Sequence, residues 1–159
     1  MRLWIVLAAL GLAAACLPQS QTGQEGQQPA MTGDRAPSQG SLPAPVEGDE
    51  TRTITADQAG QTVTVAVGER FAIALVGVPT AGYVWAPQSV PEFITRAGEG
   101  GGPTTQAQRQ PGFTGGNHWE VHYFAATAAG EGTITLAQRR PWETDTPPAA
   151  TFTVIVRAQ

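Results

Sequence analysis

Gly77-Val78-Pro79-Thr80-Ala81-Gly82-Tyr83-Val84-Trp85 is the stretch of sequence from which the fold of this chain is best predicted. An apolar run at 71–75 precedes it, and two aromatic residues alternate with a valine at its end. Alternation with a period of two is typical of a strand with one buried face. The stretch therefore predicts two strands that are joined by a short turn.

The turn itself is built from residues that restrict the backbone. Pro79 fixes its own φ and has no N–H to donate, and Gly82 permits a positive φ. Thr80 and Ala81 lie between these two residues. We therefore expect Thr80 and Ala81 to form the tip of a stiff, narrow loop.

Alternating apolar residues occur throughout the second half of the chain, at 62–67, 71–75, 119–123, 134–136 and 151–156. Turns are predicted where glycine-rich segments separate such runs, at 68–69, 98–103 and 130–132. No window has the i, i+3, i+4, i+7 spacing of a long amphipathic helix. We therefore expect residues 53–159 to form an all-β domain, an immunoglobulin-like β-sandwich of about seven to eight strands.

The first fifteen residues have the features of an export signal. Residues 1–15 contain one positive charge, an apolar run that is too short to span a bilayer, and then small residues. Cys16 follows directly and is the only cysteine, which resembles the pattern of bacterial lipoproteins, although Ala13 stands where such signals usually have leucine. We predict a lipoprotein-type signal peptide at 1–15 and a lipidated Cys16; the alternative is ordinary cleavage that leaves a free thiol.

The segment between the signal and the domain has the composition of a linker. Residues 16–52 are rich in Gln, Gly and Pro and contain almost no large apolar side chains. Such a composition cannot bury a core. We therefore expect a flexible tether that follows the lipidated cysteine.

The charge of the chain makes nucleic acid an improbable partner. Nine basic residues stand against thirteen acidic ones, and the formal net charge is −4. Binding to the phosphate backbone requires a cationic surface, and Arg139-Arg140 is the only adjacent basic pair. We expect no nucleic-acid partner.

Catalysis is also not indicated. The domain has no cysteine and a single serine, Ser89, which is not part of a Gly-x-Ser-x-Gly elbow. Its glycine-rich runs lack the Lys-Ser/Thr ending of a phosphate-binding loop. We expect neither an enzyme nor a bound cofactor.

One strand-like run contains three residues that could bind a metal ion. His118, Glu120 and His122 alternate, so they share one face of a strand and could together reach a metal ion. The simpler interpretation is that the intervening apolar set is buried and that the polar set is the solvent side of the strand. We adopt this second interpretation, with Trp119, Val121 and Tyr123 on the buried face and no metal bound.

Two later stretches carry residues that a plain turn does not need. One is Gly112-Phe113-Thr114-Gly115-Gly116-Asn117-His118-Trp119, and the other is Arg139-Arg140-Pro141-Trp142-Glu143. With the loop at 78–83, they occur in the order seen in the chagasin-like inhibitors of papain-type cysteine peptidases. Members of that family have an Asn-Pro-Thr-Thr-Gly-Tyr/Phe loop, a glycine-rich loop before an aromatic strand, and an Arg-Pro-Trp loop. The domain resembles this family over nearly its whole length.

The resemblance implies a function and a set of contact residues. It implies that the three loops lie side by side at one end of the sandwich and insert into the active-site cleft of a peptidase as a wedge. The implied contact residues come from all three loops: Pro79, Thr80, Ala81, Gly82, Tyr83, Gly115, Gly116, Arg140, Pro141 and Trp142. Thr80 would approach the catalytic cysteine of the enzyme, the two glycines would offer backbone hydrogen bonds, and Trp142 would be the aromatic anchor.

Two positions depart from the family pattern. Val78 stands in place of the asparagine that could brace the loop through its side chain, and Ala81 stands in place of the second threonine. Loss of a local side-chain hydrogen bond is expected to loosen the tip and to weaken or narrow inhibition.

Together these features predict a reversible inhibitor of papain-like cysteine peptidases that is a monomer. We expect it to be exported and anchored to a membrane through Cys16, on the periplasmic or cell-surface side of a bacterial envelope. The alternative is a non-inhibitory immunoglobulin-like envelope module that binds a carbohydrate or a protein partner. Burial of Tyr83, Trp119 and Trp142 would favour this alternative.

Overall fold

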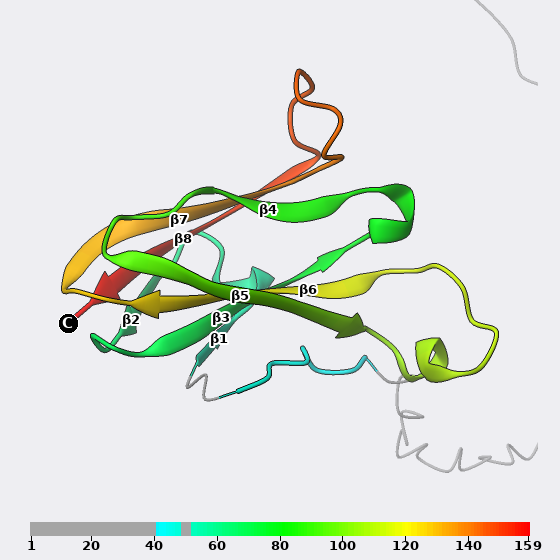
Figure 1. Ribbon diagram of the computed structural model, residues 1–159, viewed down its shortest axis with the longest axis horizontal. Helices are drawn as coiled ribbons and strands as arrows, with labels where there is room; N and C mark the ends of the chain where they lie inside the picture. The colour runs from blue at the N-terminus through cyan, green and yellow to red at the C-terminus, as the bar shows by residue number, and fades with distance from the viewer. Residues whose placement is uncertain (1–40, 49–51) are drawn as a thin grey trace, which may run out of the picture. The chain divides into compact units, whose positions relative to one another are not determined.

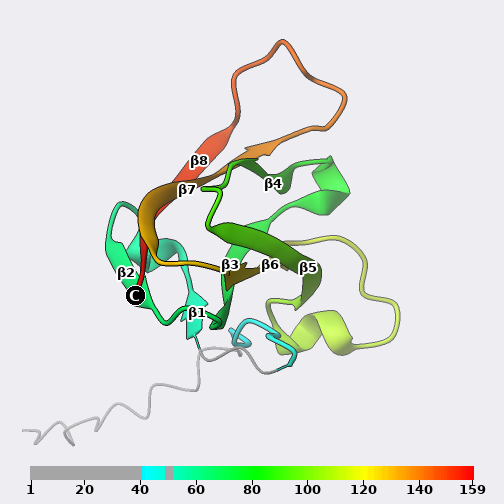
Figure 2. The ribbon, with the colours of Figure 1, turned by 60° about the vertical axis from the view of Figure 1, so that its left-hand side comes forward.

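Two four-stranded sheets, packed face to face, form the domain (Figures 1 and 2). The computed structural model describes residues 41–48 and 52–159; the expected signal at 1–15, Cys16 and most of the expected tether lie outside this part. The predicted all-β sandwich is confirmed, with eight strands: β1 Arg52–Ile54, β2 Thr62–Val65, β3 Arg70–Gly77, β4 Val84–Ser89, β5 Ile94–Pro103, β6 His118–Ala126, β7 Gly130–Arg139 and β8 Ala150–Ala158. Within the described ranges, no helix is long and apolar enough to cross a membrane.

The strands are mostly antiparallel. One sheet has the order β1-β3-β6-β5 and the other has the order β2-β8-β7-β4. The short strands β1 and β2 each pair in parallel with a long neighbour, β3 and β8 respectively. Three short 3-10 helices complete the structure: η1 Ala56–Gln58, η2 Pro79–Ala81 and η3 Gln106–Arg109.

The main core lies between the two sheets. Alternate residues of β3 and β8 point into it, as their period-two patterns predict. Its largest fully buried side chains include Phe71, Phe124, Ile73, Ile134 and Leu136. The rings of Phe71 and Phe124 are stacked with their centroids 5.7 Å apart, which fixes β3 against β6.

A second apolar cluster lies on the opposite face of the β1-β3-β6-β5 sheet. Ala72, Ala74, Val121 and Tyr123 form it, and Ala44 and Val46 pack against it. We call residues 41–48 the N-terminal strap; Figure 1 shows it in cyan, reaching toward η3. These residues were expected to belong to the flexible linker at 16–52, whereas the structure places them against the domain, because the strap carries apolar side chains that cover this face.

The second cluster confirms the buried apolar face that was expected for β6, but the other face of this strand is covered as well. Trp119, Val121 and Tyr123 are on the side covered by the strap, and the alternate residues point between the sheets. His122 is consequently 4% exposed. The interpretation of the polar set as the solvent side of the strand was therefore wrong, because it assumed only one buried face for this strand.

Two glycine-rich segments that were predicted as turns are parts of strands. The segment 98–103 lies in β5, where Gly100 leaves room for the ring of Tyr123 and Gly102 leaves room for Pro45 of the strap. The segment 130–132 opens β7, where Gly130 faces the ring of Phe93. In both segments the glycines admit a neighbouring side chain rather than reverse the chain direction.

Strand register brings the three candidate loops to one end of the sandwich. Gly77 at the end of β3 and Pro103 at the end of β5 both pair with His118 at the start of β6. Val84 at the start of β4 pairs with Arg139 at the end of β7. The loops at 78–83, 104–117 and 140–149 therefore leave the sheets at the same end, as Figure 2 shows.

Candidate functional site

The loop at 78–83 is closed by its own backbone. Val78 and Tyr83 exchange two hydrogen bonds of 3.2 Å, and the N–H of Ala81 donates to the carbonyl of Val78 (2.9 Å). Pro79 begins the 3-10 turn, and Gly82 ends it with a φ of 81°. The positive φ predicted for Gly82 is confirmed. Val78 thus braces the loop through its main chain. The effect of the missing asparagine side chain stays a prediction.

The base of this loop is held from behind by Trp85 and Glu120. The backbone N–H of Trp85 donates to Glu120 Oε2 (2.7 Å), and its indole Nε1–H donates to the carbonyl of Val76 (3.0 Å). A Cβ on Gly77 would lie 1.7 Å from Glu120 Oε1, so only glycine leaves space for this carboxylate. The start of β4 is therefore tied to both β3 and β6.

Arg140 joins the first loop to the loop that carries Trp142. Its Nε–H donates to the carbonyl of Ala81 (3.0 Å), and its Nη1–H donates to Glu143 (3.0 Å). Its guanidinium group also lies over the ring of Tyr83, 4.6 Å from the centroid. The hydrogen bond to Glu143 raises the pKa of Arg140, so the side chain stays charged.

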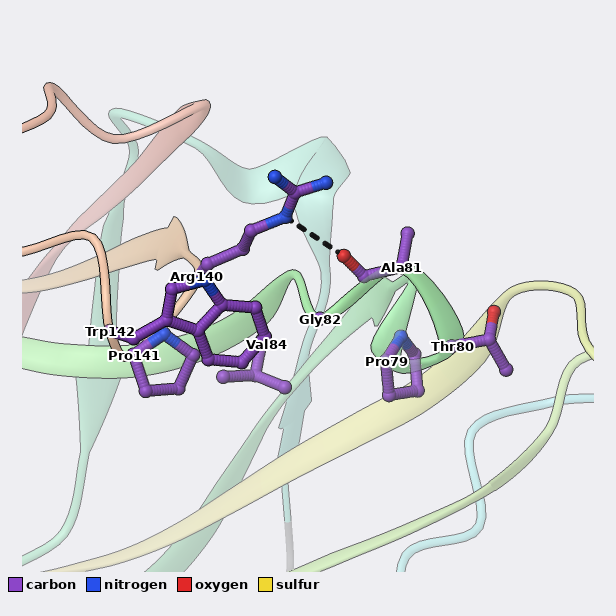
Figure 3. A pocket seen from close by; sticks show the side chains of 8 residues that line it. All are labelled: Pro79, Thr80, Ala81, Gly82, Val84, Arg140, Pro141 and Trp142. Carbon is purple, nitrogen blue, oxygen red and sulfur yellow. Dashed lines mark hydrogen bonds between the residues drawn. The ribbon is translucent and has the colours of Figure 1, made fainter.

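Trp142 packs against the same loop while remaining accessible. A Cβ on Gly82 would lie 2.5 Å from the indole of Trp142, so the ring rests where only glycine allows it. The side chain is nevertheless 68% exposed. Figure 3 shows the indole beside Pro141 and Val84, with Pro79 on the other side. These residues line an open groove of about 620 Å³. The two loops thus form one continuous exposed surface.

The loop at 104–117 carries the two candidate glycines. Gly115 and Gly116 are exposed and have φ values of 83° and 93°. Gln108 organises the loop: its Oε1 accepts from the N–H of Thr104 (2.6 Å) and Thr105 (2.9 Å), and its Nε2 donates to the carbonyl of Asn117 (2.5 Å). The glycines therefore lie on a loop with a closed base.

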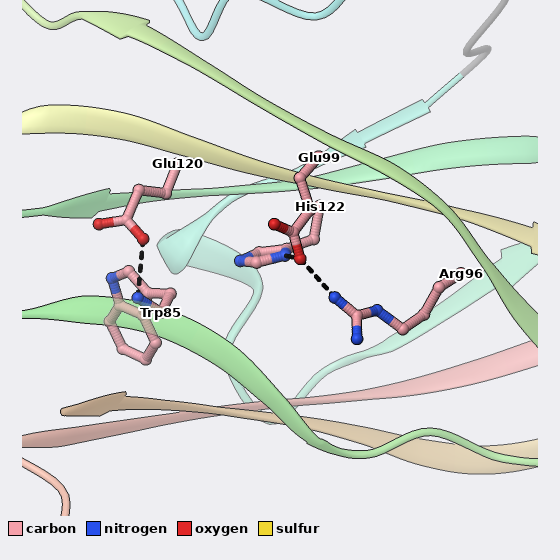
Figure 4. Close-up of polar contacts among 5 residues, drawn as sticks. All are labelled: Trp85, Arg96, Glu99, Glu120 and His122. Carbon is pink, nitrogen blue, oxygen red and sulfur yellow. Dashed lines mark hydrogen bonds and ion pairs between the residues drawn. The ribbon is translucent and has the colours of Figure 1, made fainter. Parts of the chain in front are cut away.

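Behind the first loop lies a polar cavity of about 450 Å³. Glu120, His122 and Glu99 are among the residues that line it. Figure 4 shows these three side chains together with Arg96, which pairs with Glu99. Burial lowers the pKa of His122, although the charge of Glu99, 3.5 Å from its Nδ1, acts in the opposite direction. Burial also raises the pKa of Glu120, partly offset by its bond to Trp85. Among the described residues, no group of three His, Cys, Asp or Glu side chains is arranged to hold a metal ion.

Several residues of the site were missed by the sequence reasoning. Thr105 and Gln108 form a capping box, whose Thr-x-x-Gln spacing is visible in the sequence and could have indicated the turn. Glu120 was weighed as a metal ligand and then assigned to the solvent side of its strand, so its bond to the backbone of Trp85 was not predicted. Leu42, whose backbone N–H donates to the carbonyl of Thr104 in the loop at 104–117, lies in the segment expected to be a linker, so no sequence signal pointed to it.

The chain belongs to the chagasin family of peptidase inhibitors. The sequence model of that family, described as the chagasin family peptidase inhibitor I42, matches residues 64–156. This range contains all three candidate loops. The family predicted from the three motifs is therefore confirmed, and the chain is a peptidase inhibitor by family and not an enzyme.

Individual relatives agree with this assignment. Amoebiasin-1 of Entamoeba histolytica is 35% identical over 108 residues, which cover 67% of this chain and 99% of the relative. The solution structure of Amebosin is 34% identical, with a TM-score of 0.54, over 70% of this chain and all of that one. The crystal structure of the cysteine protease inhibitor EhICP2 from Entamoeba histolytica has a TM-score of 0.58 at 20% identity, over 68% of this chain and 95% of that one, and supports the fold.

Proposed function

We propose that the chain is a reversible inhibitor of papain-like cysteine peptidases, and that its three loops insert into the active-site cleft. The observation that carries this proposal is the exposed indole of Trp142 resting on Gly82, with Arg140 bonded to the carbonyl of Ala81. A large exposed aromatic side chain is a typical anchor of a protein interface. EhICP2, a relative in fold, is named as a cysteine protease inhibitor.

The expected contacts follow the geometry of the loops. Thr80 and Ala81 form the exposed tip, and we propose that Thr80 approaches the catalytic cysteine of the peptidase. Gly115 and Gly116 have no side chains, so their backbone groups can pair with an extended groove. Trp142, supported by Arg140 and Pro141, would lie against the opposite wall of the cleft.

Stiffness explains how such a loop inhibits without being cleaved. A substrate must adopt an extended conformation in the cleft, whereas η2 holds Pro79–Ala81 in a 3-10 turn. The backbone bonds of Val78 and the contact from Arg140 oppose any change of this turn. A preorganised loop also loses little conformational entropy on binding.

A titration against papain with a fluorogenic peptide substrate tests the function. The expected result is a stoichiometric loss of activity that is recovered on dilution, with the inhibitor intact by mass spectrometry. Full activity at micromolar inhibitor, or cleavage between Pro79 and Gly82, would contradict the proposal.

We further propose that the protein is an exported lipoprotein of a bacterial envelope, anchored through Cys16, and that the domain is monomeric. The support for export and anchoring is the sequence pattern of residues 1–16, which lie outside the described ranges. The monomeric state stays a prediction. A Cys16→Ala variant is expected to move from the membrane fraction to the soluble fraction of the producing cell. Retention of that variant in the membrane fraction would contradict lipid anchoring at this residue.

The alternative of a non-inhibitory binding module is not favoured. Burial of Tyr83, Trp119 and Trp142 together would have favoured it, and Trp142 is largely exposed. Tyr83 and Trp119 are partly buried and have structural partners, Arg140 and Leu42 respectively.

A further inference from the structure

The N-terminal strap precedes the residues 64–156 that match the family, yet it contacts a loop of the candidate site. Its first residue, Ser41, forms an isolated antiparallel bridge with Thr105. The strap therefore starts at the end of the sandwich from which the three loops project. This position raises the question of what the strap does for the loop at 104–117.

The backbone of Leu42 connects the two ends of that loop. Its N–H donates to the carbonyl of Thr104 (2.7 Å), where the loop begins. Its carbonyl accepts from the indole Nε1–H of Trp119 (2.9 Å), just beyond the point where the loop ends. One residue of the strap thus holds the start and the end of the loop together.

Gln108 extends this connection to the glycines. It binds the N–H groups of Thr104 and Thr105 and the carbonyl of Asn117, so it depends on the positions that Leu42 and Ser41 fix. A Cβ on Gly116 would lie 3.0 Å from Gln108 Nε2, which places this glycine directly beside the amide. The loop has one short helical turn, η3, and Thr104 Oγ1 also donates to the carbonyl of Asn117 (3.2 Å), so the base of the loop is held by several polar contacts.

We propose that the start of the N-terminal strap, Ser41 and Leu42, is a positioning element of the peptidase-binding surface, with Leu42 bracing the base of the loop that presents Gly115 and Gly116. This inference rests on the proposed inhibition and adds a segment outside the family domain to its determinants. Two flexible glycines gain affinity from being held before binding, because ordering them in the complex then costs less.

The other half of the strap provides a matched control. The N–H of Glu47 donates to the hydroxyl of Tyr123 (3.1 Å), far from the loop along the strap. Replacing either Leu42 or Glu47 by proline removes one N–H and one hydrogen bond of the strap. Only the first replacement breaks a bond to the loop.

The test compares the full chain with its Leu42→Pro and Glu47→Pro variants. We expect Leu42→Pro to raise the inhibition constant against papain by about fivefold to tenfold, the effect of one lost hydrogen bond. Glu47→Pro is expected to leave the inhibition constant within about twofold, even if it lowers the melting temperature as much. Equal effects of the two variants, or none from Leu42→Pro, would overturn the inference.

Amide hydrogen exchange of the loop gives an independent result. Exchange at Gly115 and Gly116 is expected to accelerate in Leu42→Pro and to stay unchanged in Glu47→Pro. If Leu42→Pro does not fold, Trp119→Phe removes the other bond to Leu42 and is expected to accelerate the same amides; unchanged exchange there overturns the inference. Should the unmodified chain not inhibit papain, the proposed function fails while the exchange data still decide the role of the strap.

Discussion

The loop at 78–83 and the loop at 104–117 lie at the same end of the sandwich but are held in different ways. The first is closed by bonds between Val78 and Tyr83, and Arg140 supports it from the adjacent loop. The second depends on Leu42, which is 77 positions from its partner Trp119. Rigidity in the first loop is largely local, whereas in the second it comes from a distant segment of the chain. A substitution that loosens one of the two loops should therefore leave the order of the other loop unchanged.

Removal of the exposed indole is expected to have the largest effect on binding. Trp142→Ala should weaken binding to papain by about 1 to 4 kcal/mol, because it deletes the aromatic anchor. The melting temperature should stay nearly constant, since the side chain is largely exposed. Inhibition constants and thermal unfolding of the same preparations check both expectations.

Phe113 provides the matched control on the second loop. It is 46% exposed, so it is also a large accessible aromatic residue at this end. We expect Phe113→Ala to reduce affinity by less than Trp142→Ala does. A larger loss from Phe113→Ala would move the main anchor to the glycine-rich loop.

Gly82→Ala should have the next largest effect, about 1 to 2 kcal/mol of binding free energy. Alanine is strained at the φ of 81°, and its Cβ would displace Trp142. Gly115→Ala has a similar φ of 83° but nothing within 4 Å of the added carbon. Gly115→Ala should therefore raise the inhibition constant less than Gly82→Ala does. A larger rise for Gly115→Ala would contradict the packing of Trp142 on Gly82.

Arg140→Lys tests the connection between the first loop and its support. Lysine keeps the charge but cannot reproduce the two directed bonds to Ala81 and Glu143. We expect a severalfold weaker inhibition and faster hydrogen exchange within 79–82, without change at Gly115. Exchange that changes equally in both loops would show that they are not held separately.

The smallest effect is a change in the free energy of unfolding that comes from the imidazole of His122, which is buried behind the first loop. Because the pKa of His122 is lowered from 6.5, the unfolded chain binds a proton there at a higher pH than the folded chain does. The free energy of unfolding should therefore fall, by about 1 kcal/mol or less, as the pH drops from about 8 to about 6. A His122→Gln variant should show a smaller fall in urea titrations at these two pH values, and an unchanged fall would contradict the assignment.

Ionisation of Glu120 makes the free energy of unfolding depend on pH in the opposite direction. Its pKa is raised above 4.5, so its contribution to stability is present at low pH and is lost as the pH rises through the pKa of the folded state. A Glu120→Gln variant is expected to lose less stability than the unmodified chain between about pH 4.5 and about pH 6, as measured by urea unfolding.

Much of the fold could be predicted from the period-two patterns of β3 and β8, since the larger alternate side chains of each strand point into the main core. The pattern of β6 was equally clear, but it could not reveal that both faces of the strand are covered. That outcome depends on the strap, whose Ala44 and Val46 look unremarkable in a linker-like composition. Glycines at 100 and 102 were predicted as turns for the same reason, because the side chains that they accommodate are distant in the sequence.

The candidate site was predictable where local residue chemistry sets its shape. Pro79 and Gly82 restrict the backbone in any surroundings, and the turn that they indicated is present. The bond from Arg140 to Ala81 and the contact of Trp142 with Gly82 could not be derived from spacing, because they depend on how β4 and β7 are paired. The loop at 104–117 was the least predictable part, because Leu42 and Gln108 fix it.

The most direct test of the central claim is the dependence of inhibition on substrate concentration. If the loops occupy the active-site cleft of papain, the apparent inhibition constant should rise linearly with the concentration of a fluorogenic peptide substrate. An apparent inhibition constant that does not depend on substrate concentration would place the inhibitor outside the cleft. It would contradict the proposed insertion of the three loops.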